Sequence, residues 1–162
     1  ILWDYSAGTA ILDNCTFDGN FITTSASITG KSPWVQGGAI YIRPTGNLIV
    51  NNSEFRNCWS IREAGALYVD GANAPNTRII NTKFINNTAK GPGANVEDND
   101  RGGGGLMIKG TKNVWVINAT FINNWVNSRI KCHIRAKHSS TFNRHMANCR
   151  FAIQFFTCKL HT

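Results

Sequence analysis

The chain of 162 residues contains no long apolar run and few acidic residues. No stretch approaches the roughly 18 consecutive apolar residues of a membrane-spanning helix, which excludes such a helix here. Hydrophobic residues make up 42% of the chain, which is enough to build a core and excludes disorder throughout. No basic segment followed by an apolar one opens the chain, whose first residue is Ile1. We therefore expect a fragment or processed piece of a longer protein, without a signal peptide.

Acidic residues are absent from the segment 127–162. The whole chain carries 17 Lys and Arg against 9 Asp and Glu, a formal net charge of +8. Such a charge would suggest a nucleic-acid binder, but residues 127–162 hold seven of the basic residues and residues 1–126 are nearly neutral. We expect two parts: a repeat domain at 1–126, and a basic tail at 127–162. The tail is either disordered, not native coding sequence (out-of-frame or intron-derived), or a genuine basic domain.

A repeat built around phenylalanine recurs four times in residues 1–126. An Asn stands three residues before each Phe, an aliphatic residue stands five before it, and in three copies an Asn stands three after it. A glycine motif precedes the last three copies. The repeat residues are Asn14, Phe17, Gly38, Asn52, Phe55, Gly65, Asn81, Phe84, Gly105, Asn118 and Phe121.

The segments between these markers are typical of strands and turns. Runs of three to six residues rich in Ile, Val, Leu and Tyr alternate with segments rich in Gly, Pro and Asn. Repeats of this size stack as coils about 4.8 Å apart. We therefore predict an all-β fold, a right-handed single-stranded parallel β-helix (a solenoid) of about four coils, with an irregular C-terminal tail.

Stacking gives the repeated residues structural roles. Aliphatic residues and Phe form continuous columns in the core, and paired glycines fit where a coil bends tightly. An inward Asn column can be satisfied by amides of the coils above and below. We therefore expect Asn14 and Asn118 to face inward, which conflicts with glycosylation at their Asn-x-Thr sequons.

The two motifs together resemble a known family. Gly37-Gly38-Ala39-Ile40 matches the first motif and Phe17-Asp18-Gly19-Asn20, Phe84-Ile85-Asn86-Asn87 and Phe121-Ile122-Asn123-Asn124 match the second. They resemble the repeats of the polymorphic membrane proteins of chlamydiae, and of similar surface proteins of the right-handed parallel β-helix, pectin-lyase-like class. The resemblance implies a secreted or surface-displayed segment, often adhesive, whose membrane attachment would depend on regions absent here.

The distance between repeats varies mainly from Phe-x-x-Asn to the next glycine pair. Insertions at one point of a solenoid coil project from one edge, which is often the binding edge. Trp34 and Trp59 lie in these variable segments and are our candidates for stacking on a sugar or a partner. The alternative is that they fold back as lids on the edge of the coil.

No other motif predicts a catalytic, cofactor or metal site. Asp98 and Asp100 form part of the one acidic cluster, and oxygen-rich loops of this kind can hold calcium. The glycine and the distal Glu of the EF-hand pattern are missing, so we prefer the interpretation that this segment is a solvated loop. The remaining acids are scattered over the repeat. The tail also contains two cysteines and two histidines, Cys132, His138, His145 and Cys149. Their spacing does not fit a zinc knuckle.

These patterns predict a non-catalytic, extracellular or cell-surface scaffold with an adhesive or ligand-binding role. Its expected partners are glycans or surface proteins of a host or partner, and no specific nucleic acid. The alternative is a fragment of a pectin-lyase-like carbohydrate-active enzyme, a polysaccharide lyase or glycoside hydrolase, whose active site lies elsewhere. A third hypothesis is a nucleic-acid binder that uses the basic tail.

Overall fold

The computed structural model describes residues 1–23, 36–61, 63–71, 75–90, 103–126, 134–137 and 141–145. For residues 2–6, 134–137 and 141–145 it describes the backbone alone. Trp34, Asp98 and Asp100 lie outside these residues, so the predictions made for them remain predictions.

The described strands form four sheets in which every pair of neighbours is parallel. Sheet A contains β1 (Leu2–Ser6), β5 (Ile40–Pro44), β9 (Leu67–Asp70), β13 (Leu106–Lys109) and β17 (Ile134–Lys137). Sheet B contains β2 (Thr9–Asp13), β6 (Asn47–Asn51), β10 (Asn76–Ile80), β14 (Asn113–Ile117) and β18 (Thr141–His145). Sheet C contains β3 (Thr16–Asp18), β7 (Glu54–Arg56), β11 (Lys83–Ile85) and β15 (Thr120–Ile122). Sheet D contains β4 (Phe21–Ile22), β8 (Trp59–Ser60), β12 (Thr88–Ala89) and β16 (Trp125–Val126).

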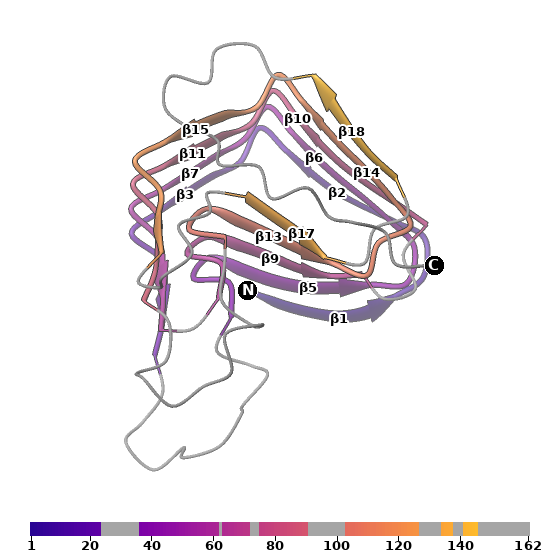
Figure 1. Cartoon of the computed structure of the whole chain (residues 1–162). Helices are drawn as coiled ribbons and strands as arrows, with labels where there is room; N and C mark the ends of the chain where they lie inside the picture. The colour runs from indigo at the N-terminus through magenta and orange to yellow at the C-terminus, as the bar shows by residue number, and fades with distance from the viewer. Residues whose placement is uncertain are drawn as a thin grey trace.

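Each coil contributes one strand to each sheet, so the chain is an all-β parallel β-helix, as predicted. Figure 1 shows the strands of sheets A, B and C stacked in chain order around a common interior. Four coils are complete in the described residues, and β17 and β18 pair with β13 and β14 as part of a fifth. Parallel pairing therefore continues past residue 126. The division of the chain at residue 126 into a repeat domain and a tail, and the origin of the tail, stay predictions.

The phenylalanine column is confirmed as the centre of the core. Phe17, Phe55, Phe84 and Phe121 stand in register in sheet C. Their rings stack face to face, with centroids 4.7, 5.0 and 4.8 Å apart along the column. The aliphatic residues five positions earlier are likewise in register in sheet B. Phe55 and Phe84 are fully buried, so the two middle coils carry the best-packed part of the core.

The glycine column runs through Gly104 rather than Gly105. Ile40, Leu67 and Leu106 are partners in sheet A, and the residues two positions before them are Gly38, Gly65 and Gly104. A Cβ atom at Gly65 would overlap the carbonyl oxygen of Gly104. The prediction for Gly105 was therefore wrong by one position, and Gly105 stands where the other two coils have alanine.

The asparagines that precede each Phe face outward, contrary to the expectation for Asn14 and Asn118. Both are exposed and have φ near +50°, as do Asn52 and Asn81. Simple alternation from the inward Val50 would turn Asn52 inward, but the left-handed backbone at Asn52 reverses the sides, so the next residue, Ser53, is buried instead. The four asparagines that precede the repeat phenylalanines therefore lie at the outer corner between sheets B and C.

The outward asparagines nevertheless form a hydrogen-bonded ladder from coil to coil. The Nδ2 atom of Asn118 donates to Asn81 Oδ1 at 2.8 Å, Asn81 donates to Asn52 at 3.3 Å, and Asn52 donates to the Asp13 carboxylate at 3.1 Å. Every amide donates toward the preceding coil, and the ladder ends on a carboxylate that only accepts. Exposed bonds of this kind fix the vertical register of the coils more than they add stability.

Three residues after the Phe, a second set of asparagines is buried in the third and fourth coils (Asn87 and Asn124), whereas Asn20 in the first coil is exposed. Asn87 donates from Nδ2 to Phe55 O and to Asn124 Oδ1, both at 2.9 Å, and its Oδ1 accepts the N–H of Cys58 at 3.0 Å. Asn124 donates to Phe84 O at 2.8 Å. These bonds satisfy backbone groups at the corner between sheets C and D, where the strands end. Cys58 replaces Asn in the second coil; among the described cysteines, it and Cys15 carry free thiols, and burial raises the pKa of the Cys58 thiol.

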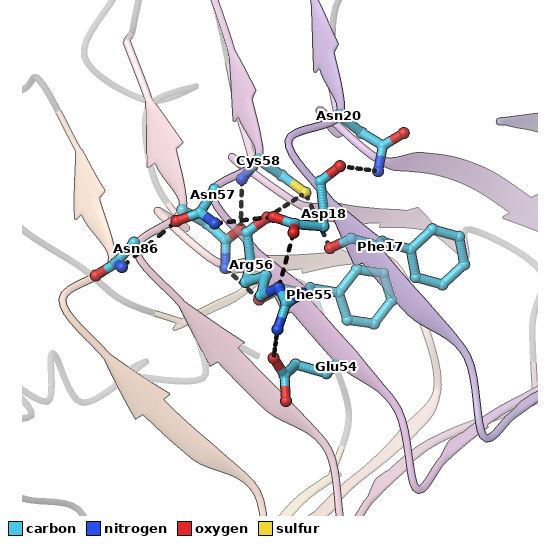
Figure 2. A network of polar contacts seen from close by, with 10 residues as sticks. Phe17, Asp18, Asn20, Glu54, Phe55, Arg56, Asn57, Cys58 and Asn86 are labelled. Atoms are coloured by element: carbon cyan, nitrogen blue, oxygen red, sulfur yellow. Dashed lines mark hydrogen bonds and ion pairs between the residues drawn. The ribbon is translucent and has the colours of Figure 1, made fainter.

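Asp18 ties the first coil to the second through an outward network, which Figure 2 shows. Its carboxylate accepts from Asn57 Nδ2 at 2.8 Å and pairs with Arg56 Nε at 2.9 Å. Arg56 also pairs with Glu54 at 3.2 Å. The Asn57 amide and the Arg56 guanidinium lower the pKa of Asp18 below its ordinary value of 3.8. The network therefore favours the ionised carboxylate.

We expect Asp18→Asn to lower the stability of the protein only where the carboxylate is ionised. The pKa of Asp18 is lower in the folded than in the unfolded chain. Its contribution is therefore complete above the unfolded value and is lost as the pH falls through the folded one. Urea midpoints of both proteins should differ at pH 7 and converge below pH 3.8. Glu54→Gln is the control, since it leaves the Asn57 bond intact; a constant difference between wild type and Asp18→Asn at every pH would contradict the prediction.

Candidate binding edge

Sheet D presents one outward residue per coil. The second residue of three of its strands is buried (Ser60, Ala89 and Val126), and Ile22 at the same position of β4 is half-buried. The first residue therefore points outward, because successive side chains alternate along a strand. The outward residues are partners in the sheet and are Phe21, Trp59, Thr88 and Trp125. We call these four residues the edge column.

Most of the edge column is aromatic and much of it is exposed. Phe21 is 60% exposed and Trp125 is 49% exposed. The Phe21 and Trp59 rings stack with centroids 5.0 Å apart and planes 4° from parallel. Exposed aromatic groups that gather along one edge are typical of a contact surface, whereas single exposed apolar residues are not.

Trp59 lies at the centre of a short stack rather than on a free surface. Phe21 covers one face of its indole, and the ammonium group of Lys90 lies 3.5 Å from the ring centroid. That distance is well within the range of a cation–π contact. The structure thus places Trp59 on the edge where sequence reasoning located it, but assigns the exposed aromatic surface to Phe21 and Trp125.

Sequence reasoning missed Phe21, Trp125 and Lys90, although a signal was present. The edge column stands four residues after each repeat phenylalanine: Phe17 precedes Phe21, Phe55 precedes Trp59, Phe84 precedes Thr88, and Phe121 precedes Trp125. Three of these four positions are aromatic, and each of the variable segments begins at this point. Aligning the residues after Phe-x-x-Asn as well as those before it would have found the column.

The described carboxylates are engaged with side chains that hold the solenoid together. Asp13 accepts from Asn52, and Asp18 and Glu54 pair with Arg56. Asp70 lies 3.7 Å from Arg43 Nε and accepts from the Tyr41 hydroxyl at 3.4 Å. Each of these contacts links one coil to another or braces a single turn, which is a structural role. Within the described part of the chain, no three acidic, histidine or cysteine residues gather as a metal site would require.

A second cluster lies on the outward side of sheet A and is buried. The Tyr41 and Tyr68 rings stack 5.2 Å apart, and Met107 follows in the same column. Glu63 is also buried and accepts from Gln36 Nε2 at 2.9 Å. Burial, and then the charge of Glu63, raise the pKa of the Tyr68 hydroxyl, so it remains protonated. Because these groups are buried, this cluster offers no exposed surface comparable to the edge column.

Comparison of the chain with protein-family models, with curated proteins and with solved structures finds no match in any of the three. Among the described residues there is also no helix of the length and apolar character needed to cross a membrane. The candidate site therefore rests on the geometry of the edge column.

Proposed function

We propose that this chain is a non-catalytic β-helix scaffold whose edge column binds a ligand at the cell surface or outside the cell, in an adhesive role. The observation that carries the proposal is the edge column on sheet D, in which the aromatic side chains of Phe21 and Trp125 are exposed on either side of the half-buried Trp59 and Thr88. Aromatic side chains contribute large, rigid contact areas at low conformational cost, which is why binding surfaces are enriched in them.

The architecture supports this role because a solenoid repeats the same position at every coil. Edge residues from successive coils therefore lie in a straight line at the spacing of neighbouring strands, about 4.8 Å. An extended ligand can contact several of them at once. The repeat resemblance to polymorphic membrane proteins, and to pectin-lyase-like proteins, is part of this proposal and suggests the same surface location.

We expect the double variant Phe21→Ala/Trp125→Ala to lose binding to an array of immobilised glycans and extracellular proteins. Truncating the two exposed ends of the column removes its contact area, so retention should fall at least about tenfold, as for the loss of a hot spot. The matched control is Ile11→Ala/Ile122→Ala, which truncates apolar residues that are 61% and 43% exposed on other sheets. Circular dichroism should show that both variants keep the β fold.

Two results would overturn the proposal. One is equal loss of binding in the aromatic variant and in the isoleucine control, which would locate the contact surface elsewhere. The other is release of new reducing or unsaturated ends from a polysaccharide by the wild-type protein, which would identify the enzyme alternative. Localisation is tested separately, by antibody labelling of intact, unpermeabilised cells that express the parent protein.

A further inference from the structure

The edge column contains one interruption. Thr88 stands between Trp59 and Trp125 and is in register with both. Neighbouring strands lie about 4.8 Å apart, so the two indoles are separated by two layers, about 9.6 Å. The coil between them supplies only a three-atom side chain at this level. We call this level of the column the Thr88 layer.

Lys90 reaches into the Thr88 layer. Its backbone N–H donates to Ser60 O at 2.8 Å, which anchors the residue beside β8. Its side chain then places the ammonium group 3.5 Å from the Trp59 ring centroid, on the opposite face from Phe21. A lysine side chain is flexible and strongly hydrated, so an exposed cation–π contact of this kind is worth only about 0.5–1 kcal/mol. A ligand can therefore displace it at small cost.

The Thr88 layer has apolar faces and a polar rim. Trp59 and Trp125 hold the column positions on either side of Thr88, while the Thr88 hydroxyl and the Lys90 ammonium supply hydrogen-bonding groups at the level between them. A saturated sugar ring has the complementary chemistry, since its C–H bonds form two apolar faces and its hydroxyl groups point outward from the rim. A phenyl ring fits the faces but leaves the rim groups without partners.

We infer that the Thr88 layer binds one hexopyranose ring of a glycan, inserted between Trp59 and Trp125, with Lys90 moving aside to hydrogen-bond its hydroxyl groups. This inference rests on the proposed function and narrows it to a ligand class and a position. The other mode of binding at this edge is contact across the outer rims of the aromatic rings, without insertion. The two modes differ in what they require of Thr88.

Thr88→Phe separates the two modes because it fills the layer with a ring. The substitution suits the fold, since phenylalanines in sheet C already stack at every coil, 4.7–5.0 Å apart. If a sugar ring inserts, the new ring occupies its place and affinity falls at least about tenfold, or 1.4 kcal/mol. If the ligand lies across the rims, a continuous aromatic column binds as tightly as the wild type or more tightly.

The probes are three neutral pentasaccharides: cellopentaose, chitopentaose and mannopentaose. Their binding is measured by calorimetry, and by shifts of the Trp59 and Trp125 indole N–H signals in ¹⁵N spectra. We expect at least one probe to shift both signals and to lose affinity in Thr88→Phe. Lys90→Met should lose less affinity than Thr88→Phe, because it removes the ammonium donor but leaves the layer open.

Unchanged or tighter binding by Thr88→Phe would overturn insertion while leaving the edge column as the binding surface. Failure of all three probes to bind the wild type would overturn the hexopyranose assignment, yet the array experiment with Phe21→Ala/Trp125→Ala would still decide the proposed function. Thermal unfolding of Thr88→Phe at or above the wild-type temperature confirms that any loss of affinity is not a loss of fold.

Discussion

Replacing Phe84 by alanine should lower the free energy of unfolding by about 3–5 kcal/mol, the usual cost of emptying a phenylalanine site in a core. Phe84 is fully buried and stacks on Phe55 at 5.0 Å and on Phe121 at 4.8 Å. The substitution therefore opens a cavity and removes two ring contacts, each worth about 0.5–1.5 kcal/mol beyond burial. Urea unfolding followed by tryptophan fluorescence measures the loss.

The position of Phe84 in the solenoid adds a second expectation. Each coil contacts only its neighbours, so the stability of such a fold is nearly a sum of coil and interface contributions. A cavity in the third coil weakens the interfaces on both of its sides, and unfolding should broaden as the first two coils uncouple from the fourth. Phe17→Ala is the matched control, because Phe17 is partly buried and stacks on Phe55 alone. A loss in Phe84→Ala no greater than in Phe17→Ala would contradict the continuous column.

The fold could be predicted from the sequence because every coil of a solenoid repeats the same residue pattern. One phenylalanine with an aliphatic residue five positions earlier says little, but four copies with the same spacing predict a column. Phe55 and Phe84 are in register as that spacing requires. Stacking turns sequence position directly into spatial position, so the core residues could be identified without knowledge of the loops.

The direction of side chains at the corners could not be predicted by the same reasoning. Alternation holds within a strand, but each corner between sheets B and C or between sheets C and D contains a residue with positive φ, such as Asn52 or Asn86, where the sides reverse. Asparagine adopts this conformation more readily than most residues because its short side chain bonds locally. The repeated asparagines were therefore evidence for left-handed corners, and reading them as an inward column placed Asn14 and Asn118 on the wrong side.

The residues of the candidate binding edge were predicted only in part, for a related reason. Trp59 was predicted because it is a tryptophan in a variable segment. Phe21 is not a tryptophan, and Trp125 does not lie in one of those variable segments. Their common property is the partnership of β4, β8, β12 and β16, strands of two residues each that alternation cannot reveal. The interruption at Thr88 has meaning only when its neighbours in the column are known.

Gly65→Ala should be among the most damaging single substitutions in the chain, with a loss of about 3 kcal/mol or more, the upper range for overpacking. The added Cβ would overlap the Gly104 carbonyl oxygen in the next coil and the amide nitrogen of Thr88. Both are backbone atoms, so no side-chain rotation relieves the overlap, and the third and fourth coils must move apart. Soluble yield, followed by thermal and urea unfolding of what remains folded, measures the effect.

Gly105→Ala is the informative comparison, because sequence reasoning assigned Gly105 to the same column as Gly65. In the structure its Cβ would lie 3.0 Å from the Cβ of Phe84 and 3.1 Å from the Asn124 side chain, at the position where Ala39 and Ala66 stand in the other coils. Side chains can yield by the few tenths of an ångström required, so the loss should stay below about 1.5 kcal/mol. If Gly105→Ala proved as damaging as Gly65→Ala, the original alignment would be right and the register of the fourth coil in sheet A would be one residue off. A small loss at Gly105 together with a large loss at Gly65 fixes the register of sheet A. Because a Cβ at Gly65 would also meet the amide nitrogen of Thr88, a large loss at Gly65 also supports the position of Thr88 beside this glycine column.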